Sequence, residues 1–212
     1  MGVREEKMDL ENLNKEQKKA VLYNEGPLLI LAGAGSGKTK VLTTKIAYLI
    51  KEKNISPYEI LAITFTNKAA KEMKERVENL IGEEARFIQI STFHSFGLKL
   101  LRENCKALGY DSNFVIMDSD DSLVIVKKIM KDLNYDIKQF SPKAVKNKIS
   151  SCKNELMTPN DYEKYVAGDF DQIILDVYRK YEEKLKSSNA VDFDDLLLLP
   201  IKLFRKHKDI LE

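Results

Sequence analysis

The segment Ala32-Gly33-Ala34-Gly35-Ser36-Gly37-Lys38-Thr39 constrains the fold of this chain more than any other feature. It follows an apolar run at residues 28–31 and opens a helical pattern that begins at Lys38. Glycines let such a turn wrap tightly, so that successive backbone N–H groups point inward at phosphate groups, and the helix N-terminus adds partial positive charge. The segment therefore predicts a strand, a phosphate-binding loop and a helix in succession.

The end of this loop supplies the side chains that a bound nucleotide needs. Lys38 can reach the β- and γ-phosphate oxygens, and the Thr39 hydroxyl can hold Mg²⁺, so these two residues are the candidate catalytic and metal-binding positions. The strict pattern asks for glycine at its first position, where this chain has Ala32. We predict a site for a nucleoside triphosphate and Mg²⁺, formed by Ala32, Gly33, Ala34, Gly35, Ser36, Gly37, Lys38, Thr39 and Lys40.

Composition limits the class of protein. The chain has 212 residues, is 43% hydrophobic and carries a net charge of only +2. This composition is typical of a globular protein, and any nucleic-acid binding must come from local patches and not from a global field. The longest apolar stretch, residues 196–204, is too short to span a bilayer, and residues 1–19 are too charged for a signal peptide. We therefore expect a cytoplasmic protein without a membrane partner, in which Cys105 and Cys152 are buried free thiols.

Hydrophobic periodicity predicts an α/β fold. Apolar runs at residues 28–31, 60–65 and 87–90 alternate with helical patterns, as in a doubly wound parallel sheet, and the run at 60–65 is expected to be buried on both faces. No strand signal occurs from about 117 to 190, where Ser141-Pro142 and Thr158-Pro159 are typical helix starts. The expected fold is a P-loop parallel α/β sheet core with an all-helical subdomain inserted into it or appended to it. The resemblance described next implies that this core is RecA-like and that the helical subdomain is inserted.

Further segments give the chain a family resemblance. Their sequences are Leu13-Asn14-Lys15-Glu16-Gln17, Thr64-Phe65-Thr66-Asn67-Lys68-Ala69-Ala70-Lys71-Glu72-Met73, Ser91-Thr92-Phe93-His94-Ser95-Phe96 and Val191-Asp192-Phe193-Asp194-Asp195-Leu196-Leu197. With the phosphate-binding loop, in this order, they make the chain resemble the N-terminal part of superfamily 1 DNA helicases of the UvrD/Rep/PcrA type. The resemblance implies three parts: residues 1–110 as the first RecA-like ATP-binding domain, 111–188 as a helical insertion, and 189–212 as a return to that domain.

The resemblance also implies the roles of individual residues. Gln17 would read the adenine edge, although Asn14 and Gln17 also form a capping-box pattern at a helix start. Residues at the carboxyl ends of two strands would bind single-stranded DNA, with aromatic rings available for base stacking. The candidate DNA-binding residues are Thr64, Phe65, Thr66, Asn67, Thr92, Phe93 and His94. From the residues alone, Phe65 could equally be a core residue and His94 an ordinary surface residue.

Two charged segments have simpler interpretations. Asp192-Phe193-Asp194-Asp195 is interpreted as a helix start, with Asp192 as the cap and the other carboxylates in the positive first turn. Pro200 should kink or break the helix that follows. The five lysines of residues 138–153 predict a solvated face, and the alternative is a patch that tracks the phosphates of duplex DNA.

The sequence lacks a second acidic element that the resemblance implies, an apolar strand followed by Asp-Glu-x-x-Asp. We therefore expect an N-terminal portion of an ATP-dependent helicase acting on single-stranded and forked DNA in repair or replication. Truncated before that motif and without a second RecA-like domain, it would bind ATP and not hydrolyse it. The alternatives are a non-enzymatic, nucleotide-dependent nucleic-acid-binding module, or the N-terminal portion of a RecB- or AddA-like helicase-nuclease.

Two other classes of P-loop protein are disfavoured. A GTPase is disfavoured because Ala70 stands where the guanine-binding motif that begins with Asn67-Lys68 needs an aspartate. A small-molecule kinase is disfavoured because the helical region lacks an arginine-rich lid.

Overall fold

A computed structural model describes residues 10–211 of the chain. The chain divides between Phe93 and His94 into two compact units, each with its own packed core. No helix in the described residues is both long enough and apolar enough to cross a membrane.

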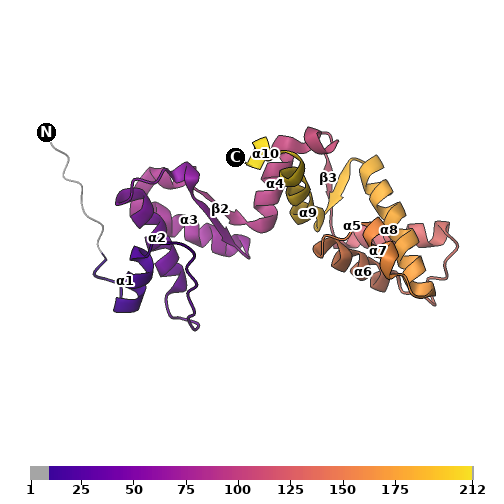
Figure 1. Cartoon of the computed structure of the whole chain (residues 1–212), viewed down its shortest axis with the longest axis horizontal. Helices are drawn as coiled ribbons and strands as arrows, with labels where there is room; N and C mark the ends of the chain where they lie inside the picture. Colours follow the sequence, from indigo (N-terminus) through magenta and orange to yellow (C-terminus); the bar gives the residue numbers. More distant parts are fainter. Residues whose placement is uncertain (1–9, 212) are drawn as a thin grey trace. The chain divides into compact units, whose positions relative to one another are not determined.

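The first unit combines helices with a small parallel sheet (Figure 1). Its elements are α1 (Lys15–Leu22), α2 (Lys38–Lys51), a 3₁₀ turn at Pro57–Glu59, β1 (Leu61–Thr64), α3 (Asn67–Ile81), a 3₁₀ segment at Gly82–Phe87 and β2 (Gln89–Thr92). β1 and β2 pair in parallel, with Leu61 opposite Gln89 and Thr64 opposite Thr92. Side chains of α2, α3 and the sheet form its core, including Ile46, Ile50, Met73, Val77 and Ile88.

The helix after the phosphate-binding loop forms as predicted, but with a different buried face. The sequence pattern put Leu42, Ile46 and Leu49 on the core side, whereas Leu42 is 47% exposed and Leu49 is only partly buried. Ile46 and Ile50 contribute to the core instead. The helix is therefore rotated about its axis relative to the prediction. Its sequence has apolar residues on two adjacent faces, and the pattern alone does not decide which of them is buried.

The strand predicted at residues 28–31 is wrong for the part of the chain that the structure covers. This segment is extended without strand pairing, and Leu29 and Leu31 are 80% and 86% exposed. A strand requires a hydrogen-bonded neighbour, and within residues 10–211 the four assigned strands pair only with one another. The segment is apolar, but no strand among the described residues pairs with it.

The strand predicted at residues 60–65 forms, but it is not buried on both faces. Leu61 is 50% exposed, and the remaining residues of β1 are only partly buried. Both faces of a strand are covered only when further layers pack on each side of a wide sheet, and this sheet has two strands.

The second unit is mostly helical (Figure 1). Its elements are α4 (Phe93–Asn104), a 3₁₀ segment at Cys105–Leu108, β3 (Val115–Met117), α5 (Ser119–Asp132), α6 (Pro142–Asn154), α7 (Pro159–Tyr162), a 3₁₀ turn at Glu163–Tyr165, α8 (Asp169–Ser187), β4 (Ala190–Asp192), α9 (Asp195–Lys206) and α10 (Lys208–Leu211). β3 and β4 pair in parallel, with Val115 opposite Ala190. Every regular element between these two strands is a helix, as the sequence predicted; the assignment of domains beyond this stays a prediction.

The core of the helical segment lies among α5, α6 and α8. Val126 and Met130 of α5 pack with Ile149 of α6 and with Ile174 and Tyr178 of α8, and all five are almost fully buried. The sequence pattern places Val145, Ile149, Cys152 and Leu156 on one face of the helix that starts at Pro142. The first three are buried in α6, whereas Leu156 lies beyond the end of α6 with a positive φ of 60°. Cys105 and Cys152 are both free and buried, as expected.

α9 contradicts one local prediction. Pro200 was expected to kink or break this helix; the break is wrong, because α9 runs as one helix from Asp195 to Lys206. Pro200 lies five residues after the start of the helix and is buried against its neighbours. Packing of an apolar helix face offsets the lost hydrogen bond in such cases.

Candidate functional site

The loop before α2 has the geometry of a phosphate cradle. Gly35 and Gly37 adopt left-handed conformations with φ of 75° and 85°, and α2 begins directly after Gly37. Lys38 Nζ donates to the carbonyl oxygens of Ala32 (2.8 Å) and Gly33 (2.6 Å). The ammonium group is thus held on the loop itself, at a helix N-terminus that carries partial positive charge. This donor set fits a triphosphate, whose oxygens can replace the two carbonyl acceptors.

Gln17 connects α1 to this loop. Its Oε1 accepts from Asn14 N (3.1 Å), and Asn14 Oδ1 accepts from Gln17 N (2.9 Å), which is the capping box predicted from the sequence. Its Nε2 donates to the Ser36 carbonyl oxygen (3.0 Å). The amide therefore caps α1 and contacts the loop at once, so reading adenine would require it to exchange one of these partners.

A pocket of about 200 Å³ lies beside the loop. It is lined by Asn14, Glu16, Gln17, Ala20, Ile30, Leu31, Ala32, Ser36, Lys38 and Val41. Lys40, the last of the predicted nucleotide-binding residues, donates from Nζ to the Asn12 carbonyl oxygen (2.6 Å). Lys40 thus binds the segment before α1 in this structure, while the pocket is bounded by Gln17 and Lys38.

Gly37→Ala is expected to destabilise the loop, because a residue with a Cβ is strained at a φ of 85°. The free energy of unfolding should fall by about 1–2 kcal/mol, the cost of a left-handed conformation for an L-residue. A Cβ at this position would also approach Gln17 Nε2 at 2.8 Å, which the flexible amide can relieve by moving. Urea unfolding followed by circular dichroism measures the change.

Gly33→Ala is the matched control for that substitution. Gly33 has no positive φ, and an added Cβ would meet no atom within 4 Å. We expect its unfolding free energy to stay within about 0.5 kcal/mol of the parent value. Equal effects of the two substitutions would contradict the strained-loop explanation.

The carboxyl ends of β1 and β2 bring two aromatic rings together. Thr64 and Thr92 are opposite one another in the parallel pair, so Phe65 and Phe93 follow at the same edge of the sheet. Their ring centroids are 6.5 Å apart, and the residues are 94% and 53% exposed, respectively. The alternative that Phe65 is a core residue is therefore wrong.

The polar candidates around these rings are partly engaged within the protein. Thr66 is the N-cap of α3 and accepts from Ala69 N (3.1 Å), while Thr64 Oγ1 donates to the Thr66 carbonyl oxygen (3.0 Å). Thr92 is only 6% exposed, and its hydroxyl donates to Asn67 Oδ1 (3.4 Å). The rings of Phe65 and Phe93 are therefore more accessible than Thr92.

His94 belongs to the second unit, where it meets an aromatic residue that the sequence analysis did not select. The rings of His94 and Phe193 lie edge to face with centroids 6.0 Å apart, and Phe193 is 50% exposed. Gly97, one turn further along α4, is buried against the Leu196 carbonyl oxygen of α9, so the two helix starts approach closely. Phe193 directly follows β4, and the rule that ligands bind beyond strand carboxyl ends would have identified it.

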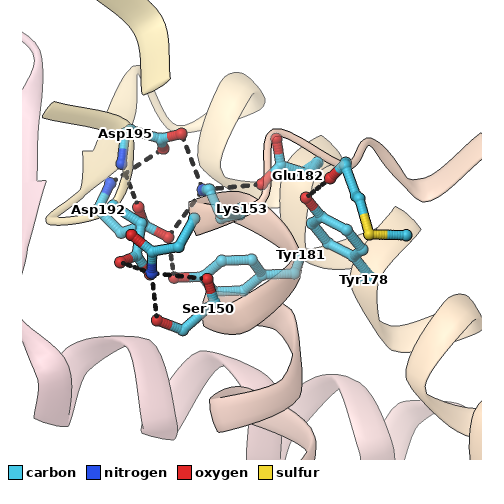
Figure 2. A network of polar contacts seen from close by, with 10 residues as sticks. Ser150, Lys153, Tyr178, Tyr181, Glu182, Asp192 and Asp195 are labelled. Atoms are coloured by element: carbon cyan, nitrogen blue, oxygen red, sulfur yellow. Dashed lines mark hydrogen bonds and ion pairs between the residues drawn. The ribbon is translucent and has the colours of Figure 1, made fainter. Parts of the chain in front are cut away.

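The Asp192–Asp195 turn is more than a helix start. Asp192 Oδ1 does accept from Asp195 N (2.9 Å), which agrees with a capping role, although α9 itself begins only at Asp195. Both carboxylates are also buried against Lys153 (Figure 2). Burial raises the pKa of Asp195 to about 7, with the Lys153 ammonium opposing this rise and Asp192 and Glu182 adding to it.

Lys153 corrects the interpretation of the lysine-rich segment. The sequence predicted that this lysine lies on a solvated or DNA-facing surface, but it is 1% exposed. Lys143 on the same helix is exposed, as expected, and Lys146 Nζ donates to Ser119 Oγ (2.6 Å). The charge pattern alone could not distinguish them, because the carboxylates that bury Lys153 are distant in sequence.

Comparisons with known proteins give a consistent assignment. The model of the family described as the UvrD/REP helicase N-terminal domain matches residues 13–212. The chain is 50% identical over 203 residues to the ATP-dependent DNA helicase PcrA of Bacillus subtilis and 48% identical over 203 residues to that of Staphylococcus aureus strain COL. Each match covers 96% of this chain and 28% of the relative, so the chain spans just over a quarter of the length of these relatives.

Proposed function

Because the chain belongs to the UvrD/REP helicase N-terminal domain family, we propose that it is the ATP-binding portion of an ATP-dependent DNA helicase that moves on single-stranded DNA and unwinds duplexes. The observation that carries this proposal is the loop at residues 32–39, with Lys38 held at the start of α2 beside the pocket lined by Gln17. The same proposal includes a RecA-like sheet with a helical insertion in this chain, and a second RecA-like domain in the remainder of the helicase. It also includes forked DNA as substrate, a role in repair or replication, and a cytoplasmic location.

The residues of the loop fit ATP with Mg²⁺. Lys38 would neutralise charge on the β- and γ-phosphates, backbone N–H groups of the glycine-rich turn would bind phosphate oxygens, and Thr39 would hold the cation. Gln17 would bind the adenine edge with its amide. Mg²⁺ would supply electrostatic stabilisation of the phosphate oxygens. Competition of ATP and GTP for the chain tests the base preference, since equal affinities would argue against an adenine contact by Gln17.

We propose that the chain by itself binds ATP but does not hydrolyse it. Phosphoryl transfer to water needs an acidic group that orients the water and another that holds Mg²⁺, and the 212 residues contain no Asp-Glu-x-x-Asp motif after an apolar strand. The measurement is phosphate release with and without oligothymidine. DNA-stimulated turnover that disappears in Lys38→Ala would overturn the proposal.

Single-stranded DNA is proposed to bind at the two aromatic pairs, each considered within its own unit. Phe65 and Phe93 expose their rings beyond β1 and β2, and Phe193 exposes its ring beyond β4 next to His94. Exposed aromatic rings flanked by hydroxyl and amide groups suit bases that stack without sequence preference. The exposure of Phe65, which serves no core of the described chain, is the strongest support for this part.

Phe65→Ala is expected to weaken oligothymidine binding by roughly 5- to 150-fold, the loss of about 1–3 kcal/mol for one base stack. Fold stability should hardly change, because the side chain is 94% exposed. Fluorescence anisotropy of a labelled oligothymidine at fixed salt measures the affinity. Tyr165→Ala is the control, since it removes another exposed aromatic ring, at 67%, that is not among the candidate residues.

An unchanged affinity in Phe65→Ala would exclude stacking on this ring. Binding of oligothymidine without any binding of ATP would instead favour the alternative of a nucleic-acid-binding module. Neither measurement distinguishes UvrD-, Rep- and PcrA-type helicases from RecB- or AddA-like proteins, which are expected to share this part of the chain.

A further inference from the structure

Lys153 is a buried cation whose contacts come from three other elements. Its Nζ lies 3.0 Å from Glu182 Oε1 of α8, 2.9 Å from Asp192 Oδ2 at the end of β4 and 2.8 Å from Asp195 Oδ1 at the start of α9. Burial disfavours the charged ammonium, but the three carboxylates more than offset this and raise the pKa of Lys153 well above its usual value. The three carboxylates therefore favour the charged form of the buried ammonium.

Two of the ion pairs of Lys153 are made with one short turn, residues 192–195. Asp192 and Asp195 lie at the two ends of that turn and also bond to each other, from Asp192 N to Asp195 Oδ2 (3.1 Å) and from Asp195 N to Asp192 Oδ1 (2.9 Å). Tyr181 OH donates to the same Asp192 Oδ2 (2.9 Å), as Figure 2 shows. Asn154, the residue after Lys153, donates to Asp194 Oδ1 (3.1 Å).

Three of the four residues in the turn are thus fixed by side chains of α6 and α8. The fourth is Phe193, which is half exposed and meets the ring of His94. A buried ion cluster contributes little net stability compared with apolar packing, because the desolvation of its charges is costly. What such a cluster can provide is one defined conformation, since each carboxylate must keep its place to satisfy the ammonium.

We propose that Lys153 is a positioning residue, which fixes the Asp192–Asp195 turn so that Phe193 is held against His94 in the orientation that receives a base of single-stranded DNA. The inference rests on the proposed function, because it assumes that His94 and Phe193 contact DNA. The ion cluster around Lys153 would thus connect α6 and α8 to the proposed DNA interface. Side chains of α6 thereby act on DNA affinity without touching DNA.

The test uses the whole chain with 4-fluorophenylalanine at position 193, which gives a fluorine NMR signal for that ring alone. The parent chain should show one narrow resonance. Lys153→Met should broaden, split or shift it, while Lys143→Met, which removes an exposed lysine of the same helix, should leave it unchanged. An unchanged resonance in a folded Lys153→Met chain would overturn the positioning role.

Oligothymidine affinity provides the second readout through a double-mutant cycle. Lys153→Met should weaken binding by about 5-fold or more, the lower end of the loss for one stacked base. In a Phe193→Ala background the same substitution should have almost no further effect, because the ring that it positions is already gone. Equal losses in both backgrounds would mean general destabilisation and would contradict the proposal.

Lys153→Arg covers the case in which Lys153→Met does not fold. Arginine keeps the charge but changes its geometry, so the fold should persist while the fluorine resonance shifts and affinity falls by a smaller factor. Unaltered resonance and affinity in folded Lys153→Arg and Lys153→Met would overturn the proposal. A parent chain that does not bind oligothymidine would refute the DNA-binding part, and the fluorine signal would then still decide whether Lys153 positions Phe193.

Discussion

Lys38→Ala is expected to weaken MgATP binding by about 10- to 150-fold, which corresponds to the loss of a charge-assisted hydrogen bond worth about 1.5–3 kcal/mol. In the structure the ammonium group donates to the carbonyl oxygens of Ala32 and Gly33 on the exposed loop, so it can transfer to phosphate by exchanging these two acceptors. For the same reason the unfolding free energy should change little. Isothermal titration calorimetry with a non-hydrolysable ATP analogue measures the affinity.

Lys51→Ala provides the matched control for Lys38. It removes the same charge from the exposed last turn of the same helix, α2, far from the glycine-rich loop along the helix axis. Its nucleotide affinity should equal that of the parent chain. If both substitutions reduced affinity equally, the effect would come from net charge and not from a specific phosphate contact.

Gly97→Ala is expected to destabilise the second unit by about 3 kcal/mol, at the upper end of the cost of overpacking a core. A Cβ at Gly97 would overlap the backbone carbonyl oxygen of Leu196 and would lie 3.3 Å from Pro200 Cγ. Backbone cannot rotate away as a side-chain end can, so α4 and α9 would have to separate. Thermal or urea unfolding of the chain, with a probe in the second unit, measures the loss.

Separation of α4 from α9 should also disturb the candidate DNA interface of that unit. His94 is one turn before Gly97, and Phe193 lies just before α9, so their ring contact depends on the close helix approach. The control is Gly168→Ala in the same unit, where an added Cβ would meet nothing within 4 Å. A Gly97→Ala chain as stable as the Gly168→Ala chain would show that the helices tolerate a wider separation.

Local hydrogen bonding explains which elements were predicted well. Asn14, Ser141 and Thr158 each cap the helix that the sequence assigned to them, with side-chain oxygens accepting from backbone N–H groups three residues ahead. Such contacts depend only on neighbours in the chain, so residue type and spacing are sufficient to identify them. The helical character of the segment between β3 and β4 was predictable for the same reason.

The candidate nucleotide site was predictable in part. Glycines at positions 35 and 37 permit the left-handed conformations that the structure contains, and Lys38 follows at the helix start as the motif predicts. Gln17 was selected by resemblance, and its contact with Ser36 could not be derived from spacing because the two residues are on different elements. The sequence analysis did not select Phe193, because the segment Asp192–Asp195 was interpreted only as the start of a helix.

The sequence by itself determined the glycine-rich turn ahead of α2, the capped helix starts, the strand within residues 60–65, and the family. These follow from contacts within a few residues and from motifs whose chemistry requires particular side chains. Tertiary structure alone decided that Lys153 is buried and that His94 meets Phe193. It also decided that residues 28–31 lack a partner strand among the described residues. The physical reason is that burial, ion pairing and strand pairing depend on groups far away in the chain, whose proximity no local pattern specifies.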